Sequence, residues 1–543
     1  MPVRSRAPRT TAALAALAAT AVLAGCSGGG QAAGDDGPPR SGGTLTYAVG
    51  ADIACADPQQ AGNGDELTAA RGLADSLTDQ DPDTGRIVPW LATKWRTGDR
   101  GRSYTFTLRH GVTFSDGGPL DARAVKESFD GVRRLGGKAV QATTYLTGFR
   151  RVVVVRPDTV RFDFERPNAQ FLAATSSVSL AVVSPATARR SAADRCTEGV
   201  VGSGPFILDR FTPNQQVVQR ARKGYAWPSR VAPGTATPGS STRARLDRLV
   251  LKVVPETRVR VGGLQSGEFD AVAAVPPQDE QTLKATGFPL LARPVPGLVQ
   301  SLNVNVARPA TKDPAVRRAL QKAIDRDEIV RTVYTPDYRT ARSALASTTP
   351  HFADVGSYLA TDRTAARSLL DGAGWRPGAD GVRAKDGRRL ALTAVWFGAG
   401  SGPAQSTLEL VQQQLKAVGV ALTIKTVPLS RALETFRTGA YDLALGNAST
   451  ADPDILRNYY TPKGLDVVRL GAGPLRDALY AQSADLDPKA RARHLRTAQR
   501  LLVADAYALP LYESRTVVGV GKKVHGITFD AASRPLFAHA WLS

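Results

Sequence analysis

The chain has 543 residues, of which 42% are hydrophobic and 22% are charged. This length predicts several domains or lobes with ample core, and the composition is ordinary for a globular protein. The formal net charge is +21, but Arg and Lys are scattered along the sequence and form no basic block. We therefore expect an Arg-rich, solvated surface that can lie near anionic lipid head groups, and we expect no nucleic-acid partner.

The N-terminus has the pattern of a lipoprotein signal peptide over residues 1–25. Three arginines precede an uncharged run of mostly Ala and Leu at 10–24, which is too short for a comfortable membrane span. The tetrapeptide LAGC that ends this region resembles the bacterial lipobox, with cleavage before Cys26 and a diacylglyceryl group on its thiol. Residues 26–42 are rich in Gly, Ser, Asp and Pro and predict a flexible linker. The alternative is an ordinary signal peptide with a chance cysteine.

The rest of the sequence contains no run of 18 apolar residues, so it predicts no further membrane span. Two cysteines follow the linker. In an oxidising compartment an even pair favours a disulfide between Cys55 and Cys196, which would stabilise the fold by roughly 4–5 kcal/mol in the chain-entropy model. Two buried free thiols are the alternative.

Strands and helices alternate along much of the chain. Residues 43–49 (GTLTYAV) and 104–109 (YTFTLR) alternate apolar and polar side chains, as half-buried strands do. Asp121 stands where an N-cap would, and a helix that opens at Asp313 carries apolar residues at helical spacing up to Ile324. Further expected elements are a hairpin at 152–155 and 160–164, strands at 206–208, 216–219 and 420–426, and helices at 67–77, 362–372 and 406–418. Helices between strands predict an α/β protein with a parallel sheet.

The sequence shows no catalytic constellation. Its five histidines stand at no metal-ligand spacing, and the nucleophile-elbow and Ser-x-x-Lys motifs are missing. We therefore expect neither an enzyme nor a metal or cofactor site. A Ser/His/Asp triad assembled from distant segments is the open alternative, although lone Ser and Asp residues usually cap helices or form turns.

Several segments form an ordered series of motifs. The most specific is YTFTLRHGVTFSDGGPLDARAVKESF at 104–129, a strand followed by a Leu-Arg-x-Gly-Val-x-Phe-x-Asp-Gly turn and a capped helix. The others are LADSLTDQDPDTGRIVPWLATKW at 73–95, VGSGPF at 201–206, GLQSGEFDA at 263–271, and residues 302–330 and 362–375. In this order they resemble the family 5 extracellular solute-binding proteins of ABC transporters, the peptide- and nickel-binding group. The resemblance runs from about residue 42 to the C-terminus.

The resemblance implies an α/β fold of the periplasmic-binding-protein class II, with two large lobes hinged by extended strands and an extra inserted lobe. We expect lobe I at 43–82, 200–300 and 510–543, the inserted lobe at 83–199, and lobe II at 301–509. The resemblance also implies the function. A monomer, lipid-anchored on the extracellular face of the cell membrane (the periplasmic side where an outer membrane exists), would capture a solute, expected to be an oligopeptide. It would then deliver the solute to the permease and ATPase subunits of an ABC importer.

In such a fold the ligand lies between the lobes, where strands end. The candidate stretches are 50–60, 395–402 and 445–454, and the residues expected at the ligand are Trp396, Phe397, Asn447 and Asp452. The family's peptide binders carry a carboxylate in the third stretch, for which Asp452 is the nearest match, but they have an aromatic residue where Asn447 stands. The alternatives are that Asp452 caps a helix at 455–460 and that Trp396 is a core residue.

Other ligands and other functions stay open from the sequence. An oligosaccharide or a metal chelate could occupy the same fold, although the few histidines argue against direct nickel ligation. A surface hydrolase or a signalling lipoprotein would belong to a different functional class.

Overall fold

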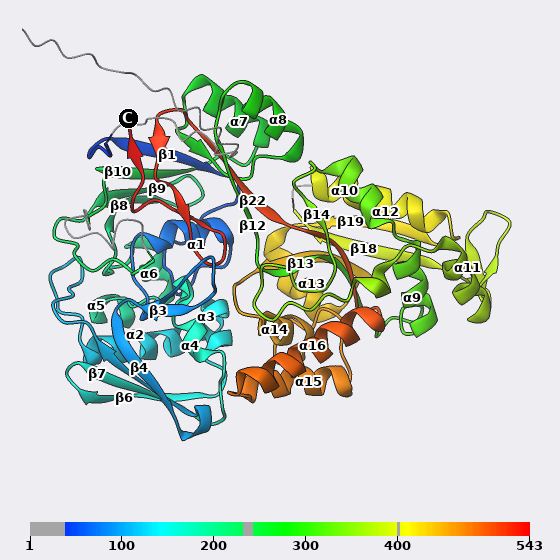
Figure 1. Ribbon diagram of the computed structural model, residues 1–543, viewed down its shortest axis with the longest axis horizontal. Helices are drawn as coiled ribbons and strands as arrows, with labels where there is room; N and C mark the ends of the chain where they lie inside the picture. The colour runs from blue at the N-terminus through cyan, green and yellow to red at the C-terminus, as the bar shows by residue number, and fades with distance from the viewer. Residues whose placement is uncertain (1–37, 232–242, 399–401) are drawn as a thin grey trace, which may run out of the picture. The chain divides into compact units, whose positions relative to one another are not determined.

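Two large sheets and a smaller one organise the chain (Figure 1). The computed structural model describes residues 38–231, 243–398 and 402–543, and Pro39–Ser543 form one compact unit. The expected signal peptide, Cys26 and the linker as far as residue 37 lie outside the described residues. None of the described helices is long and apolar enough to cross a membrane.

The first sheet has seven strands and forms the core of the first lobe. Its order is β12 (Leu290–Pro294), β22 (Arg515–Val520), β11 (Ala271–Val272), β1 (Thr44–Val49), β10 (Arg248–Val253), β9 (Gln216–Ala221) and β8 (Phe206–Thr212). Leu45, Tyr47 and Val49 of β1 are all buried, as predicted for one face, but Ala48 is buried as well, so the alternation does not continue to the end of the strand. Helices α1 (Gly64–Arg71), α7 (Thr257–Ser266) and α8 (Pro277–Ala285) also belong to this lobe.

A four-stranded antiparallel sheet lies within the segment expected to be inserted. Its order is β4 (Ala92–Gly98), β5 (Ser103–Leu108), β7 (Thr159–Phe164) and β6 (Phe149–Arg156). Helix α2 (Ala122–Leu135) packs on it, and the predicted N-cap is present, since the Asp121 carboxylate accepts a hydrogen bond from the Ala124 N–H. The shorter helices of this inserted lobe are α3 (Val140–Tyr145), α4 (Phe171–Ala174), α5 (Pro185–Arg189) and α6 (Ala192–Thr197).

The six-stranded sheet forms the core of the second lobe. Its order is β14 (Arg339–Thr340), β21 (Ala508–Glu513), β13 (Gly297–Val304), β20 (Leu443–Ser449), β18 (Ala391–Phe397) and β19 (Ala421–Val427). Its helices are α9 (Pro314–Ala323), α10 (Arg326–Val333), α11 (Arg363–Gly372), α12 (Pro403–Lys416), α13 (Ala432–Thr438), α14 (Ile455–Tyr460), α15 (Pro474–Ala484) and α16 (Pro488–Ala504).

Two details differ from the expectations. Both large sheets are mixed rather than parallel: β1 is parallel to β10 and β11, whereas β9 and β22 run antiparallel to their neighbours. Helix α9 ends at Ala323, and Ile324 is extended yet still fully buried. Two strands of the six-stranded sheet extend past residues 301 and 509, since β13 begins at Gly297 and β21 continues to Glu513.

Two chain crossings join the large lobes and form a hinge. Strand β12 leads through Val295 and Pro296 into β13, and β21 leads through Ser514 into β22. The paired strands β12 and β22 run together from the first sheet toward the second (Figure 1). The Val295 N–H donates to the Ser514 carbonyl at 2.9 Å, so the two crossings are hydrogen-bonded to each other.

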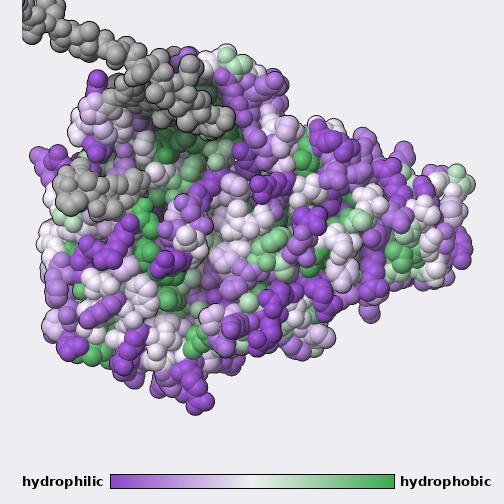
Figure 2. All heavy atoms as spheres, in the orientation of Figure 1, coloured by the Kyte–Doolittle hydropathy of each residue, from purple (hydrophilic) through white to green (hydrophobic). Residues whose placement is uncertain are grey.

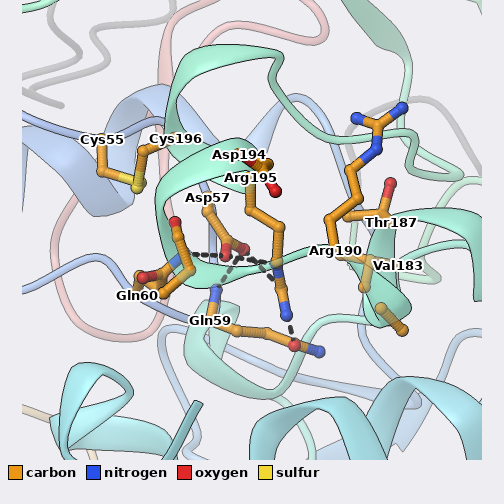
Figure 3. Close-up of polar contacts among 12 residues, drawn as sticks. Cys55, Asp57, Gln59, Gln60, Val183, Thr187, Arg190, Asp194, Arg195 and Cys196 are labelled. Atoms are coloured by element: carbon orange, nitrogen blue, oxygen red, sulfur yellow. Dashed lines mark hydrogen bonds and ion pairs between the residues drawn. A yellow bond between two sulfur atoms is a disulfide. The ribbon is translucent and has the colours of Figure 1, made fainter. Parts of the chain in front are cut away.

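A disulfide and a buried ion pair fasten the segment after β1 to the inserted lobe (Figure 3). Cys55 and Cys196 form the expected disulfide, with their Cα atoms 4.8 Å apart. Next to it the Arg195 guanidinium, on α6, pairs with Asp57 and donates to the Gln59 side chain at 2.8 Å. Both links join the same two segments, so they hold the first lobe and the inserted lobe together.

Candidate functional site

The second lobe meets the first where β20 ends. The Asn447 side-chain amide donates to the Ser514 hydroxyl in the hinge at 3.2 Å. Two residues later, the Ser449 hydroxyl donates to the carbonyl of Ala532, in the loop that follows β24 (Thr528–Phe529), at 2.7 Å. These bonds place the end of β20 at the junction of the lobes.

Two cavities lie along this junction, and Ala451 and Ala531 line both. The larger has a volume of about 400 Å³, which is within the usual range for small-ligand sites. The smaller has about 50 Å³. The larger is lined by the turn between β2 (Thr78–Gln80) and β3 (Ile87–Pro89), by the hinge residues Arg293, Pro294 and Pro296, and by Thr348, Thr349 and Pro350 of the second lobe.

Charges of both signs line these cavities. At the larger one, Arg293 donates to the Asp83 carboxylate at 3.0 Å and to the Pro82 carbonyl. The Thr84 N–H donates to the Asp81 carboxylate and holds the pKa of that group below its usual range, so it is charged near neutral pH. At the smaller cavity Arg71 pairs with Asp79 at 3.1 Å. The lining therefore carries charges of both signs, but Arg293 and Arg71 are already paired with carboxylates of the protein itself.

The comparisons with known proteins agree with this architecture. Residues 86–465 match the model of the family described as "Bacterial extracellular solute-binding proteins, family 5 Middle". The chain belongs to this family. It is 24% identical over 487 residues to the "Probable D,D-dipeptide-binding periplasmic protein DdpA" of Escherichia coli K12, a match that covers 86% of each chain.

Two solved structures share the fold of this family 5 solute-binding protein. NikA from Brucella suis in complex with Fe(III)-EDTA has a TM-score of 0.79 at 24% identity, covering 92% of this chain and all of NikA. The oligopeptide-binding protein AppA from Bacillus subtilis in complex with a nonapeptide has a TM-score of 0.78 at 20% identity, covering 93% of this chain and all of AppA. The α/β fold of periplasmic binding proteins is thus confirmed. As a family 5 member the protein is an extracytoplasmic solute-binding protein of an ABC transporter and not an enzyme.

Of the four residues expected at the ligand, Asn447 and Asp452 lie at the junction. Asn447 is exposed and contacts the hinge, but it lines neither cavity. Asp452 lines the smaller cavity, but its carboxylate pairs with Arg491 at 2.9 Å and accepts a hydrogen bond from the Asp454 N–H at 2.7 Å. It does not form a side-chain cap of α14, which starts after Asp454. Its negative charge is therefore already compensated within the second lobe.

Trp396 and Phe397 lie away from the lining of both cavities. Trp396 is only 6% exposed and belongs to the hydrophobic core of the second lobe. Phe397 is half-buried and packs edge-to-face on Phe436, with ring centroids 5.1 Å apart. The remainder of the expected stretch includes residues 399–401, which lie outside the described residues.

The expected stretch at 50–60 holds the inserted lobe instead of lining either cavity. It contains Cys55, Asp57 and Gln59, all of which are bonded to α6 and buried. Its Ala51 N–H donates to the Asp65 carboxylate at 2.8 Å. These polar groups therefore form hydrogen bonds within the protein and are not available to a ligand.

Several lining residues have no recognisable sequence pattern. The Asp81–Gly85 turn is visible as a turn cluster, but Arg293 is one of many scattered arginines. The loop at Asp530–Ser533 comes near the C-terminus, and only the folded chain brings it beside Ala451. The turn motif could have indicated the Asp81–Gly85 segment. Arg293 and the loop at Asp530–Ser533 reach the cavities only through long-range contacts.

Proposed function

We propose that this protein is the substrate-binding lipoprotein of an ABC importer and that its ligand is an oligopeptide. The two lobes would close on the peptide and present it to a membrane permease, whose ATPase drives import. The observation that carries the ligand class is the junction cavity of about 400 Å³ with both Arg293 and Asp81 on its lining. A short peptide is a zwitterion: its amino group would pair with Asp81, and its carboxylate would take the place of Asp83 on Arg293.

The surroundings of the cavity support a peptide in two further ways. Asn447 is exposed at the end of β20, and its amide can both donate and accept, as a peptide backbone requires. The described lining of the larger cavity contains no aromatic side chain, although aromatic side chains offer the flat faces on which apolar rings stack. A polar, extended ligand fits this lining better than a stacked ring.

A metal chelate is the second candidate, because the similar NikA structure contains Fe(III)-EDTA. Among the described residues no group of three or more His, Cys, Asp or Glu side chains could hold a metal ion. A metal would therefore have to arrive with its own chelator, whose carboxylates could bind Arg293.

The proposal includes the lipid anchor at Cys26. The small residues before this cysteine and the Gly- and Ser-rich linker after it support attachment at the extracellular face of the membrane. Mass spectrometry of the protein from its native membrane would test it. A mature N-terminus at Cys26 with a diacylglyceryl mass is expected, and cleavage elsewhere without lipid would contradict it.

A thermal-shift screen of the chain from residue 39 tests the ligand class. Peptides, oligosaccharides and metal chelates are compared, and a ligand at 100 times its Kd stabilises the fold by roughly 2.7 kcal/mol. A shift with peptides alone supports the proposal. A shift only with sugars or chelates would reject the peptide.

The variant Arg293→Gln locates the site. Loss of a charged hydrogen-bond donor should weaken peptide binding about tenfold or more. The control Arg258→Gln removes an exposed guanidinium that lies outside the cavity lining and should leave the affinity unchanged. Equal affinities for the two variants would move the site away from the larger cavity.

A further inference from the structure

Helix α16 carries a cationic stripe along its exposed face. The helix spans Pro488–Ala504 and contains no acidic residue. Its exposed cations are Lys489, Arg493, Arg496 and Arg500. Their spacings of four, three and four residues place all four on one side of an α-helix, within about 60° of one another. The rise of the helix spreads them over about 16 Å.

The opposite face of α16 anchors the stripe rigidly in the second lobe. Leu495, Ala498 and Leu502 are fully buried there. The Gln499 side chain accepts a hydrogen bond from the Ser343 hydroxyl at 3.0 Å and donates to the His351 carbonyl at 2.9 Å. The orientation of the stripe is therefore fixed by packing.

The four cations of the stripe remain available for contacts with a partner. None of their side chains forms a hydrogen bond or ion pair within the part of the chain that the structure describes. The two basic residues of the helix outside the stripe behave differently, since Arg491 pairs with Asp452 and His494 lies 3.5 Å from Asp485. Asp487 caps the helix by accepting hydrogen bonds from the Lys489 and Ala490 N–H groups and forms no ion pair with the stripe in the described part of the chain, so the stripe keeps most of its positive charge.

The side chains of the stripe favour a lipid surface over a protein as its partner. Protein interfaces have apolar or aromatic centres, and among the cations they are enriched in Arg but depleted in Lys. The stripe has no apolar side chain among its members, although Leu486 just before the helix is 40% exposed. Figure 2 shows hydrophilic and hydrophobic residues intermixed on the face of the molecule that it presents, with the hydrophilic ones more numerous. A row of flexible cations without an apolar centre fits a diffuse anionic surface, where each Lys or Arg contributes separately.

We propose that the stripe on α16 docks the second lobe on anionic phospholipid head groups. The contact goes beyond solute binding and beyond the proposed anchor, because it needs neither a ligand nor Cys26. It would turn one lobe toward the bilayer while the linker holds the other end of the chain nearby. The protein would then be oriented at the surface where its permease lies.

Vesicle co-sedimentation of the chain from residue 39, which forms one compact unit, tests this proposal without the anchor. The vesicles are pure phosphatidylcholine or phosphatidylcholine with phosphatidylglycerol. We expect binding to the anionic vesicles at low salt, little binding to the neutral ones, and release as the salt concentration rises. The variant Lys489→Gln/Arg493→Gln/Arg496→Gln/Arg500→Gln should lower partitioning on the order of a hundredfold.

A charge-matched control separates the stripe from the net charge. Lys94, Arg96, Arg258 and Arg388 are also exposed, and replacing all four by Gln removes the same charge at positions outside α16. This control should bind the anionic vesicles within about threefold of the wild type, since its four residues lie outside α16 and so away from the face that the proposal places on the membrane. Equal losses of vesicle binding in the two variants would show that the net charge of the protein, and not the stripe, drives binding. A stripe variant that binds vesicles normally but fails in transport would assign the stripe to the permease and overturn the lipid proposal.

Discussion

Arg195 and Asp57 form an ion pair from which water is completely excluded. The guanidinium Nη2 donates to Oδ1 at 2.9 Å, Nε lies 2.8 Å from Oδ2, and neither side chain is exposed. The pair links α6 of the inserted lobe to the segment after β1, beside the Cys55–Cys196 disulfide (Figure 3). The inserted lobe should therefore move with the first lobe when the hinge closes.

Removing one partner of this pair should destabilise the protein strongly. Arg195→Met leaves the Asp57 carboxylate buried without its cation, which costs about 3–5 kcal/mol of unfolding free energy. Urea denaturation measures this loss. The control Arg189→Gln breaks an exposed pair with Glu127 and should cost less than about 1 kcal/mol. Similar losses in both variants would contradict the special role of the buried pair.

The disulfide should stabilise the same junction through the unfolded chain. It closes a loop of 141 residues, for which the chain-entropy model gives about 5 kcal/mol. The double variant Cys55→Ser/Cys196→Ser should therefore unfold at a much lower urea concentration than the wild type. Dithiothreitol should destabilise the wild type and leave the double variant unchanged. A wild type that is insensitive to the reductant under unfolding conditions would argue against the bond.

The sequence predicts the elements of this fold better than their assembly. Local patterns suffice for β1, for the cap of α2 at Asp121 and for α11, because each depends on residues close in the chain. The direction of a strand depends on which distant strands it pairs with. Strand β22 comes from the C-terminal part of the chain yet pairs with β11 and β12 in the first sheet. The mixed sheets therefore could not follow from the alternation of helices and strands.

For the candidate site too, local sequence patterns predict some residues, whereas others depend on long-range contacts. Asn447 and Asp452 could be placed at the junction because they belong to the stretch at 445–454, where a strand is expected to end; in the structure Asn447 lies near the end of β20 and Asp452 follows it. Trp396 could not be distinguished from a core residue, since a strand of the second sheet has both faces covered and gives no alternation at this end. Arg293 and the loop at Asp530 reach the cavity only through the hinge and the returning C-terminus.

Asp75 should make the stability depend on pH. The carboxyl group is fully buried and accepts hydrogen bonds from the Ser203 hydroxyl and the Trp227 indole. Burial raises its pKa from 3.8 to about 6, in spite of these bonds and of Arg71. The folded state therefore binds the proton more tightly than the unfolded state. The stabilisation is complete below about pH 4 and is lost as the pH rises through about 6.

The variant Asp75→Asn isolates this contribution. The unfolding free energy of the wild type, relative to that of the variant, should fall by roughly 2.4 kcal/mol between pH 4 and pH 7. Urea titrations at several pH values measure the difference. Parallel pH profiles for the two proteins would mean that Asp75 does not titrate in this range.

Asp452 should matter for stability more than for ligand affinity. Its carboxylate is bound to Arg491, and both side chains are largely buried, at 12% and 15% exposure. Asp452→Asn and Arg491→Gln break the same bond, so each should lower the unfolding free energy by about 2 kcal/mol. Calorimetric titration with the peptide found by the screen should give affinities within about twofold of the wild type for both variants. A tenfold loss for Asp452→Asn alone would show that the carboxylate leaves Arg491 and binds the amino terminus of the peptide.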